Sequence, residues 1–362
     1  MGEFALVAFG AAAVVAAALT PLARWAARMA GLVAEVRPDR IHTEPRPYGG
    51  GLALADTLTL VLGGAWLLGL YAPAEWLPGW LPPEVRVHLA ARTPVLLRLA
   101  FGALVFFIIG LLDDFYDLGA LPKFLMQAFG SALVVVGFGL SATVWMEAEW
   151  VGQVVSILWL LAVVNAYNMF DHADGMAAAV GVVAFASLAA GQMMMGEWFV
   201  PGVALAAAGA LAGFLLYNFP PARLFMGDAG SHLVGYLFGA LAMVARYYFP
   251  ARGTTRWVVL VPVVLFAVPL IDMVLVSAGR LARKRNPMVG DATSHLAHRM
   301  LARGAHPWMV VLAAAGLTAF AGVGATLLYL PHPLLVPGAL SLAVVFAAMV
   351  WLRRQPEREA RA

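Results

Sequence analysis

Long apolar segments separated by short polar ones recur along almost the whole chain. A helix needs about 20 residues to cross the hydrocarbon core of a membrane, and the hydrophobic pattern predicts eleven such helices. They are expected at residues 4–22, 51–70, 94–112, 121–140, 151–166, 175–194, 199–217, 232–249, 257–279, 308–330 and 334–352. The pattern therefore predicts an all-α, polytopic integral membrane helix bundle, formed by one domain that spans residues 1–362.

Composition agrees with this pattern. Of the 362 residues, 62% are hydrophobic and 12% are charged, whereas a soluble domain carries about 25% charged residues. Cysteine is absent, which excludes a disulfide framework, a thiolate metal site and a cysteine nucleophile. The first apolar segment has the look of a signal peptide, but ten more follow it without a small-residue cleavage pattern, so we expect it to remain as a helix.

Basic residues are distributed unequally between the two sides of the predicted bundle. Of the 23 lysines and arginines, 17 fall on one side, together with the loops near residues 23–50, 113–123, 165–175, 218–231 and 280–307. The six on the other side are Arg86, Arg92, Arg98, Arg246, Arg252 and Arg256. Because positive residues stay cytoplasmic, the N-terminus is expected outside and the C-terminus inside an inner (cytoplasmic) membrane.

Acidic residues of the apolar segments gather on the predicted cytoplasmic side. They are Asp113, Asp114, Asp117, Asp171, Asp174, Asp228, Asp272 and Asp291. A carboxylate at the edge of an apolar helix is costly unless it is paired or bound to a metal, so their common depth suggests a shared partner. A hard divalent cation is the simplest partner, and we expect Mg²⁺, with Mn²⁺ as its substitute.

The segment DDFYDLGALPK, residues 113–123, ends one predicted helix with adjacent aspartates and places Lys123 within reach of the same surface. Two neighbouring carboxylates can hold Mg²⁺, or one of them can act as a base whose pKa is moved by the other. The alternative is a helix cap, in which Asp113 and Asp114 lie beside positive helix N-termini.

The segment NAYNMFDHADG, residues 165–175, spaces Asn165, Asn168, Asp171 and Asp174 at three-residue intervals. If the helix continues through them, they lie along one slowly drifting face. Amides can bind a polar headgroup or base, and carboxylates can bind metal or ribose. The alternative is a helix end broken at Gly175, although capping rarely needs four such groups.

Two further segments add anion-binding chemistry. In FPPARLFMGDAGSH, the glycines would let a phosphate approach backbone N–H groups at a helix N-terminus, and Asp228 could ligate the accompanying cation. In RKRNPMVGDATSHLAHRM, the spacing of His295 and His298 raises zinc as an alternative. No third soft ligand stands nearby, so phosphate recognition by the imidazoles and Arg299 is favoured.

The ordered series DDFYDLGALPK, NAYNMFDHADG, FMGDAGS and HLAHR resembles the polyprenyl-phosphate N-acetylhexosamine-1-phosphate transferases. RPDRIHTEPRPYGGGLAL, residues 37–54, resembles that family's first cytoplasmic loop, so the likeness covers nearly the whole chain. It implies an Mg²⁺-dependent transfer of a sugar 1-phosphate from a UDP-sugar, with UDP-N-acetylglucosamine as first choice, to undecaprenyl phosphate in the bilayer. The products would be a lipid diphosphate sugar and UMP.

The resemblance also implies roles for individual residues. The catalytic residues would be Asp113, Asp114 and Asp228, of which Asp228 and Asp114 would bind the metal. Lys123, His295, His298 and Arg299 would hold phosphates, and Asn165, Asn168, Asp171 and Asp174 would line the nucleotide-sugar pocket. Whether Asp113 acts as a base or a positioning group is open, because a phosphate monoester is already mostly ionised near neutral pH.

Other functions remain alternatives at this point. HLAHR has Ala297 where many relatives carry another histidine, and His172 and Ala173 stand where relatives often have glycine and an aliphatic residue. These departures leave the hexosamine open, including the phospho-MurNAc-pentapeptide of peptidoglycan synthesis. A metal-dependent membrane phosphatase would share the carboxylates, and a secondary transporter would place charges near mid-membrane in paired repeats, which are not evident. No nucleic acid partner is expected, and a homodimer is open.

Overall fold

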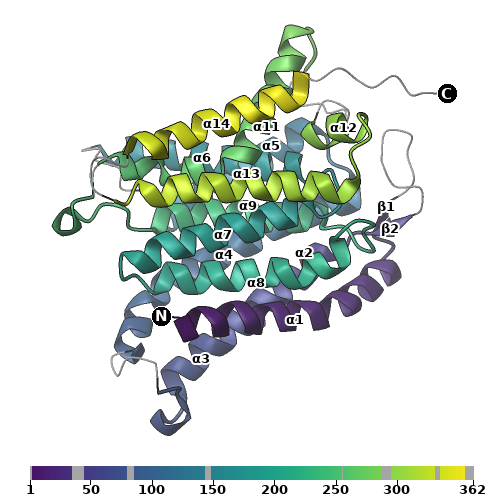
Figure 1. Cartoon of the computed structure of the whole chain (residues 1–362). Helices are drawn as coiled ribbons and strands as arrows, with labels where there is room; N and C mark the ends of the chain where they lie inside the picture. Colours follow the sequence, from purple (N-terminus) through teal and green to yellow (C-terminus); the bar gives the residue numbers. More distant parts are fainter. Residues whose placement is uncertain are drawn as a thin grey trace.

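The structure is a computed structural model that describes residues 2–34, 45–79, 85–142, 148–254, 256–286, 295–330 and 335–354. Helices dominate this part of the chain, and two two-residue strands form its one small sheet (Figure 1). The helices are α1 (Gly2–Met29), α2 (Gly50–Leu58), α3 (Gly64–Tyr71), α4 (Val85–Tyr116), α5 (Ala120–Ala132), α6 (Glu149–Phe170), α7 (Met176–Met194), α8 (Phe199–Asn218), α9 (Gly227–Val244), α10 (Val261–Leu265), α11 (Ala267–Ala282), α12 (Leu296–Leu301), α13 (Pro307–Leu327) and α14 (Leu335–Arg354). The strands β1 (Val33–Ala34) and β2 (Arg46–Pro47) pair antiparallel.

Eight helical segments of the described chain are long and apolar enough to cross a membrane. They are Gly2–Met29, Gly50–Tyr71, Arg86–Tyr116, Ala120–Gly137, Glu149–Phe170, Met176–Met194, Phe199–Asn218 and Pro307–Leu327. The polytopic membrane bundle is therefore confirmed, whereas the number eleven and the orientation of the termini stay predictions.

The span predicted at residues 257–279 is not one straight helix. Arg256–Leu265 and Ala267–Ala282 are apolar enough to form a ninth span together, but they meet at a bend of 70°. Phe266 lies at this break and is almost completely buried. Hydropathy averages over such a break, so a prediction from hydropathy alone could not locate it.

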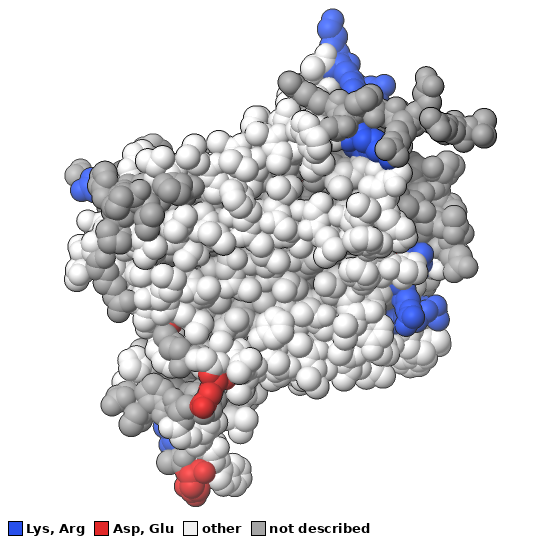
Figure 2. Space-filling model, in the orientation of Figure 1, with Lys and Arg blue, Asp and Glu red and all other residues white. Residues whose placement is uncertain are grey.

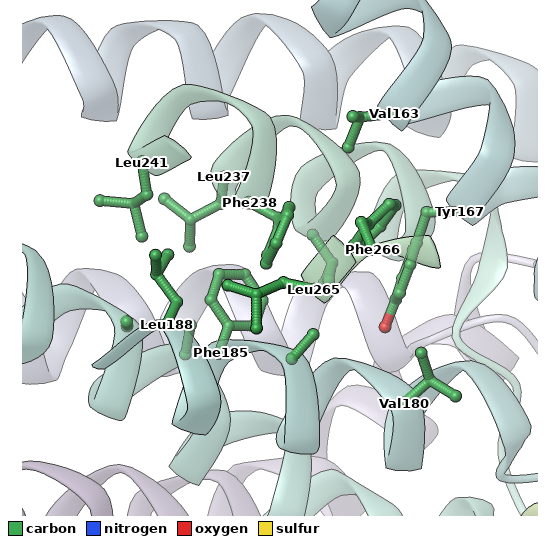
Figure 3. Close-up of a cluster of buried hydrophobic side chains, with 14 of the residues drawn as sticks. Val163, Tyr167, Val180, Phe185, Leu188, Leu237, Phe238, Leu241, Leu265 and Phe266 are labelled. Atoms are coloured by element: carbon green, nitrogen blue, oxygen red, sulfur yellow. The ribbon is translucent and has the colours of Figure 1, made fainter. Parts of the chain in front are cut away.

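Helix α9 lies at the centre of the bundle and packs against α4, α6 and α2. Its aromatic side chains contact neighbours on two sides, since the Phe238 ring lies 4.4 Å from that of Phe266 and 5.5 Å from that of Phe185. Leu237, Leu241 and residues of α7 surround this contact (Figure 3). The buried apolar packing fixes α9, and with it the polar residues at its N-terminus.

Charges on the visible surface lie mainly at the two ends of the long helices. Figure 2 shows most of the lysine and arginine surface at the right-hand end, the end of β1, β2 and α12 in Figure 1. The acidic surface in this view lies at the lower left, near α3, and small basic patches lie at the upper left and beside the acidic residues. The middle of the molecule is free of visible charge, as expected of a surface that faces lipid.

Candidate active site

A lysine held between two aspartates forms the centre of the candidate site. Asp113 lies near the end of α4, Lys123 in the first turn of α5, and Asp228 in the first turn of α9. The Lys123 Nζ is 2.6 Å from Asp113 Oδ2 and 3.2 Å from Asp228 Oδ1. The backbone N–H of Leu118 donates to Asp113 Oδ1 at 2.9 Å, which fixes the carboxylate. Two motifs more than a hundred residues apart therefore meet, as the sequence predicted.

Asp114 caps the N-terminus of α9 from the neighbouring helix α4. Its two oxygens accept the backbone N–H groups of Asp228, at 2.7 Å, and Ala229, at 2.9 Å. Gly227 permits this approach, because its φ of 75° is left-handed and a Cβ there would lie 2.8 Å from Asp114 Oδ2. The prediction of a phosphate on these two N–H groups is wrong, since the carboxylate occupies them. The cap alternative fits Asp114, whose role as a metal ligand stays a prediction.

The asparagines of α6 lie at two depths beside α9. Asn168 donates from Nδ2 to Asp228 Oδ1 and, at 2.8 Å, to Ser231 Oγ. Asn165, almost one helical turn deeper, donates to Gln127 Oε1 at 2.7 Å and to the carbonyl oxygen of Leu161 at 2.8 Å. Asn168 is therefore in direct contact with the central cluster, whereas Asn165 reaches α5 beneath it.

The helix does not continue through the second motif. It ends at Phe170, and Gly175 has a left-handed φ of 71°, so Asp171 and Asp174 leave the face that carries the asparagines. The prediction of one continuous helical face is wrong for these two aspartates. The reason is local, because Asp171 is the C-cap of α6 with a non-helical ψ of 52°, and Gly175 is already the N-cap of α7.

Asp171 carries a carboxylate that makes no hydrogen bond or ion pair with any described residue. Burial raises its pKa well above the usual range, and the charges of Asp228, Asp114 and Asp174 raise the pKa further. Four carboxylates therefore repel one another across this region. A bound cation would relieve that repulsion.

Asp174 contacts two separate connections between the helices. Its Oδ2 accepts a 3.0 Å ion pair from Arg46 Nη1 and a 2.8 Å hydrogen bond from the backbone N–H of Ala222. Arg46 belongs to β2, and Ala222 lies in the connection between α8 and α9. The predicted role of Asp174 in the nucleotide-sugar pocket stays a prediction, and the structure adds this contact to it.

The described end of the loop between α1 and α2, from residue 45 onward, packs directly on the FMGDAGS motif. The N–H of Phe225 donates to the Pro47 carbonyl at 3.0 Å, and the N–H of Gly51 donates to the Met226 carbonyl at 2.9 Å. A Cβ on Gly51 would lie 2.5 Å from the backbone nitrogen of Gly230. Only glycine allows this approach, so the glycine run after Tyr48 holds the start of α9 in place.

Removing the Asp174 carboxylate is expected to destabilise this arrangement. In Asp174→Ala, Arg46 and the Ala222 N–H both lose a charged acceptor, at a cost of about 2 kcal/mol in the free energy of unfolding. Unfolding in mixed micelles with rising SDS would measure the cost. Glu197→Ala is the control, because its 3.9 Å pair with Arg92 is longer and its arginine is nearly half exposed, and its loss should cost at most about 0.5 kcal/mol. Equal costs would contradict the role of Asp174.

Three histidines join the second motif to the last one. The His172 ring lies 4.3 Å from the His295 ring and 5.6 Å from the His298 ring. His295 Nδ1 lies 2.7 Å from Asp272 Oδ2, which orients the ring. The His172 Nε2 is buried and has no hydrogen-bond partner among the described residues, and burial together with His295 lowers the pKa of His172 to about 3. HLAHR thus lies beside the loop that carries Asp171.

Zinc gains no support from this arrangement. Within the described ranges, no three or more histidine, aspartate or glutamate side chains are placed to hold a metal ion by themselves. Mg²⁺ makes no such demand, since it uses one or two carboxylates together with water and phosphate oxygens. Arg299 follows His298 on α12, whereas Asp291 lies outside the described residues.

Several polar residues of the site, buried or partly buried, were absent from the predicted set. They are Arg46, Gln127, His172 and His232. Gln127 and His232 are polar residues inside apolar helices, and that signal could have selected them, because such residues are rare unless they have partners. Arg46 could not be distinguished from the other arginines on the basic side. Its partner depends on how distant loops meet.

Comparisons with known proteins agree with the motifs. Glycosyl transferase family 4 matches residues 96–246, which include the central lysine and both of its aspartate partners. A Mycolicibacterium smegmatis protein named decaprenyl-phosphate N-acetylglucosaminephosphotransferase is 32% identical over 90% of this chain and 84% of its own length. A Bacillus subtilis protein named "Probable undecaprenyl-phosphate N-acetylglucosaminyl 1-phosphate transferase" is 29% identical over 81% of this chain and 76% of its own.

A second group of relatives matches a smaller part. A Synechococcus protein named phospho-N-acetylmuramoyl-pentapeptide-transferase is 34% identical over 43% of this chain and 49% of its own length. The likeness to the N-acetylglucosamine enzymes is therefore the more extensive of the two. The chain belongs to glycosyl transferase family 4, the family of lipid-linked sugar phosphate transferases that its ordered motifs predict.

Proposed function

We propose that the chain transfers N-acetylglucosamine 1-phosphate from UDP-N-acetylglucosamine to undecaprenyl phosphate on the cytoplasmic side of the inner membrane. The names of its relatives support both the reaction class and the prenyl phosphate acceptor. The observation that carries the proposal is the convergence of Asp113, Lys123 and Asp228 from three helices at the basic end of the bundle. This cluster suits two phosphorylated reactants that meet at a membrane surface.

The transfer exchanges one phosphoanhydride bond for another. An oxygen of the lipid phosphate attacks the β-phosphorus of the UDP-sugar, the phosphorus that bears the sugar. The bond from this phosphorus to the bridging oxygen breaks, and UMP leaves with that oxygen. Little covalent chemistry falls to the protein, so positioning and charge stabilisation supply most of the catalysis.

Asp228 and Asp171 would hold Mg²⁺ between the reactants. The donor set fits the ion, because Asp171 has no competing partner among the described residues and lies close enough to Asp228 for their charges to interact. Bound there, Mg²⁺ would supply positive charge that offsets the negative charge of the diphosphate. Asp114 remains the third predicted contributor, through either the metal or the cap of α9.

The other residues divide by the reactant they would contact. The Lys123 ammonium group would pair with a phosphate oxygen of a reactant. Its ion pair with Asp113 would hold it in place for that contact. Asn168 would hold the Asp228 carboxylate in its orientation. His295, His298 and Arg299, next to the Asp171 loop through His172, would bind phosphates of the UDP-sugar.

Release of UMP by the purified protein tests the proposal. The protein in detergent, with Mg²⁺, undecaprenyl phosphate and UDP-N-acetylglucosamine, is expected to release UMP and place the sugar radiolabel in the lipid phase. EDTA should abolish both signals. A panel with other UDP-hexosamines and UDP-MurNAc-pentapeptide identifies the donor. Label in water instead of lipid would indicate a phosphatase, and no UMP with any donor would overturn the proposal.

A further inference from the structure

A second polar layer lies directly beneath the catalytic cluster, inside the bundle. Gln127 of α5 and His232 of α9 are completely buried, and their side-chain nitrogens Nε2 are 2.8 Å apart. Asn165 of α6 donates to Gln127 Oε1 at 2.7 Å. At the other end, His232 Nδ1 lies 2.7 Å from the backbone carbonyl oxygen of Asp228. Four polar groups thus form one chain that ends on the residue predicted to bind the metal.

The hydrogen bonds of this chain run in a single direction. Gln127 Oε1 accepts from Asn165, so the Gln127 amide nitrogen donates to His232 Nε2. His232 then carries its proton on Nδ1 and donates it to the Asp228 carbonyl. Each ring nitrogen of His232 thus has a partner, and the imidazole needs no positive charge. Replacing the Gln127 amide therefore leaves the Nε2 of His232 without its hydrogen-bond donor.

The layer repeats the helix order of the cluster above it. In α5, Gln127 follows Lys123 by four residues, and in α9, His232 follows Asp228 by four. Residues four apart lie on one face of a helix, one turn or about 5 Å deeper here. Asn165 precedes Asn168 on α6, which runs the opposite way. Both layers therefore connect α5, α6 and α9, the upper through Lys123, Asp228 and Asn168.

We infer that Gln127 and His232 are positioning residues that fix the Lys123 ammonium group relative to the Asp228 carboxylate. Buried hydrogen bonds also hold membrane helices together in general, so a purely structural role is the competing explanation. Two features favour positioning: the chain ends on Asp228 itself, and each helix it joins supplies a group to the site. The inference rests on the proposed function for its kinetic readout.

The chain offers a matched pair of variants. Gln127→Met removes the amide and keeps the length of the side chain. Gln192→Met is the control, because Gln192 of α7 is equally buried and donates to the Arg246 carbonyl and to Tyr329 Oη at 2.9 and 2.8 Å, away from the site. Both variants should lose stability. Only Gln127→Met should lower kcat for UMP release, by about 10- to 100-fold, with KM for the UDP-sugar little changed.

A double variant separates positioning from stability. Gln127→Met with His232→Leu removes both members of the pair, so no unpaired polar atom of the pair stays buried and stability should return toward that of the wild type. The kcat should stay low, because the double variant also lacks the His232 contact with the Asp228 carbonyl. Recovery of kcat together with stability, or equal kcat in the Gln127 and Gln192 variants, would overturn the inference.

Lysine reactivity gives a readout that does not depend on the sugar donor. The chain has two lysines, Lys123 in the site and Lys284 on the surface. Amine labelling followed by mass spectrometry measures the first against the second. Gln127→Met should raise the labelling of Lys123 severalfold over the wild type, and Gln192→Met should not. Unchanged labelling would overturn the positioning role even if the wild type releases no UMP, an outcome that would separately overturn the proposed function.

Discussion

Asp228→Asn is expected to lower turnover by about 100- to 1,000-fold, the loss typical of removing one preorganised charge from a transition state. Asparagine has the size of aspartate and keeps the backbone N–H that Asp114 accepts. It loses the charge that faces Lys123 and that would bind Mg²⁺. The variant should therefore fold normally and fail in chemistry. Initial rates of UMP release at saturating substrates would measure the loss.

Asp117→Asn is the control, because it removes a carboxylate at the same end of the bundle. Asp117 lies in the loop after α4, is exposed, and has a left-handed φ of 48° that asparagine also tolerates. Its turnover should stay within about twofold of the wild type, as for most surface substitutions. Near-normal turnover in Asp228→Asn would remove Asp228 from the reaction and with it the proposed metal site.

Asp114→Asn distinguishes two roles of Asp114, that of a cap on α9 and that of a ligand for Mg²⁺. One carboxyl oxygen becomes an amide nitrogen, so one of the two N–H groups of Asp228 and Ala229 loses its acceptor. A cap role predicts a stability loss of about 1 kcal/mol and an unchanged Mg²⁺ concentration at half-maximal rate. A ligand role predicts that this concentration rises. The Mg²⁺ titration and an unfolding measurement together decide between them.

Hydropathy and motif order predicted the architecture and the place of the site. Depth along a helix follows from the distance to its polar end, so Asp113, Lys123 and Asp228 could be assigned to one face before their contacts were seen. The distances of 2.6 and 3.2 Å from the Lys123 Nζ to the carboxylates of Asp113 and Asp228 confirm that they meet. Depth does not report which side of a helix faces which neighbour. For that reason the hydrogen-bond partners of Asp174 and Asn165 could not be predicted from the sequence.

Local chain geometry caused the other differences. Three-residue spacing suggested a continuous helix, but α6 ends at Phe170 and the left-handed Gly175 is the N-cap of α7. Glycines at the start of α9 suggested a bare helix end for a phosphate, yet Gly227 makes room for the Asp114 carboxylate instead. A glycine pattern gives the same signal for a bound anion and for a close protein contact. Only the neighbours of the glycine distinguish the two.

Lys123→Met is also expected to have a large effect and to lower kcat/KM for the UDP-sugar by about 100-fold. The loss is large because the positive charge at the centre of the cluster is removed, not only a single hydrogen bond. In the wild type, Lys123 pairs with both Asp113 and Asp228. Methionine keeps the unbranched shape but leaves these carboxylates, together with Asp114 and Asp171, to repel the diphosphate. Rates over a range of UDP-sugar and Mg²⁺ concentrations would measure the effect.

Lys284→Met is the matched control, since it removes the chain's other lysine at an exposed position and should leave the rate unchanged.

How the loss divides between kcat and KM in Lys123→Met shows what Lys123 does. A higher KM with normal kcat means that the ammonium group binds the donor equally before and during transfer, whereas equal losses in kcat and kcat/KM mean that it acts on charge that develops in the transition state. The tight position of Lys123 between two carboxylates favours the second result, because a prearranged cation needs no reorganisation when that charge appears. Normal kcat and normal KM in Lys123→Met would contradict a catalytic cluster centred on this lysine.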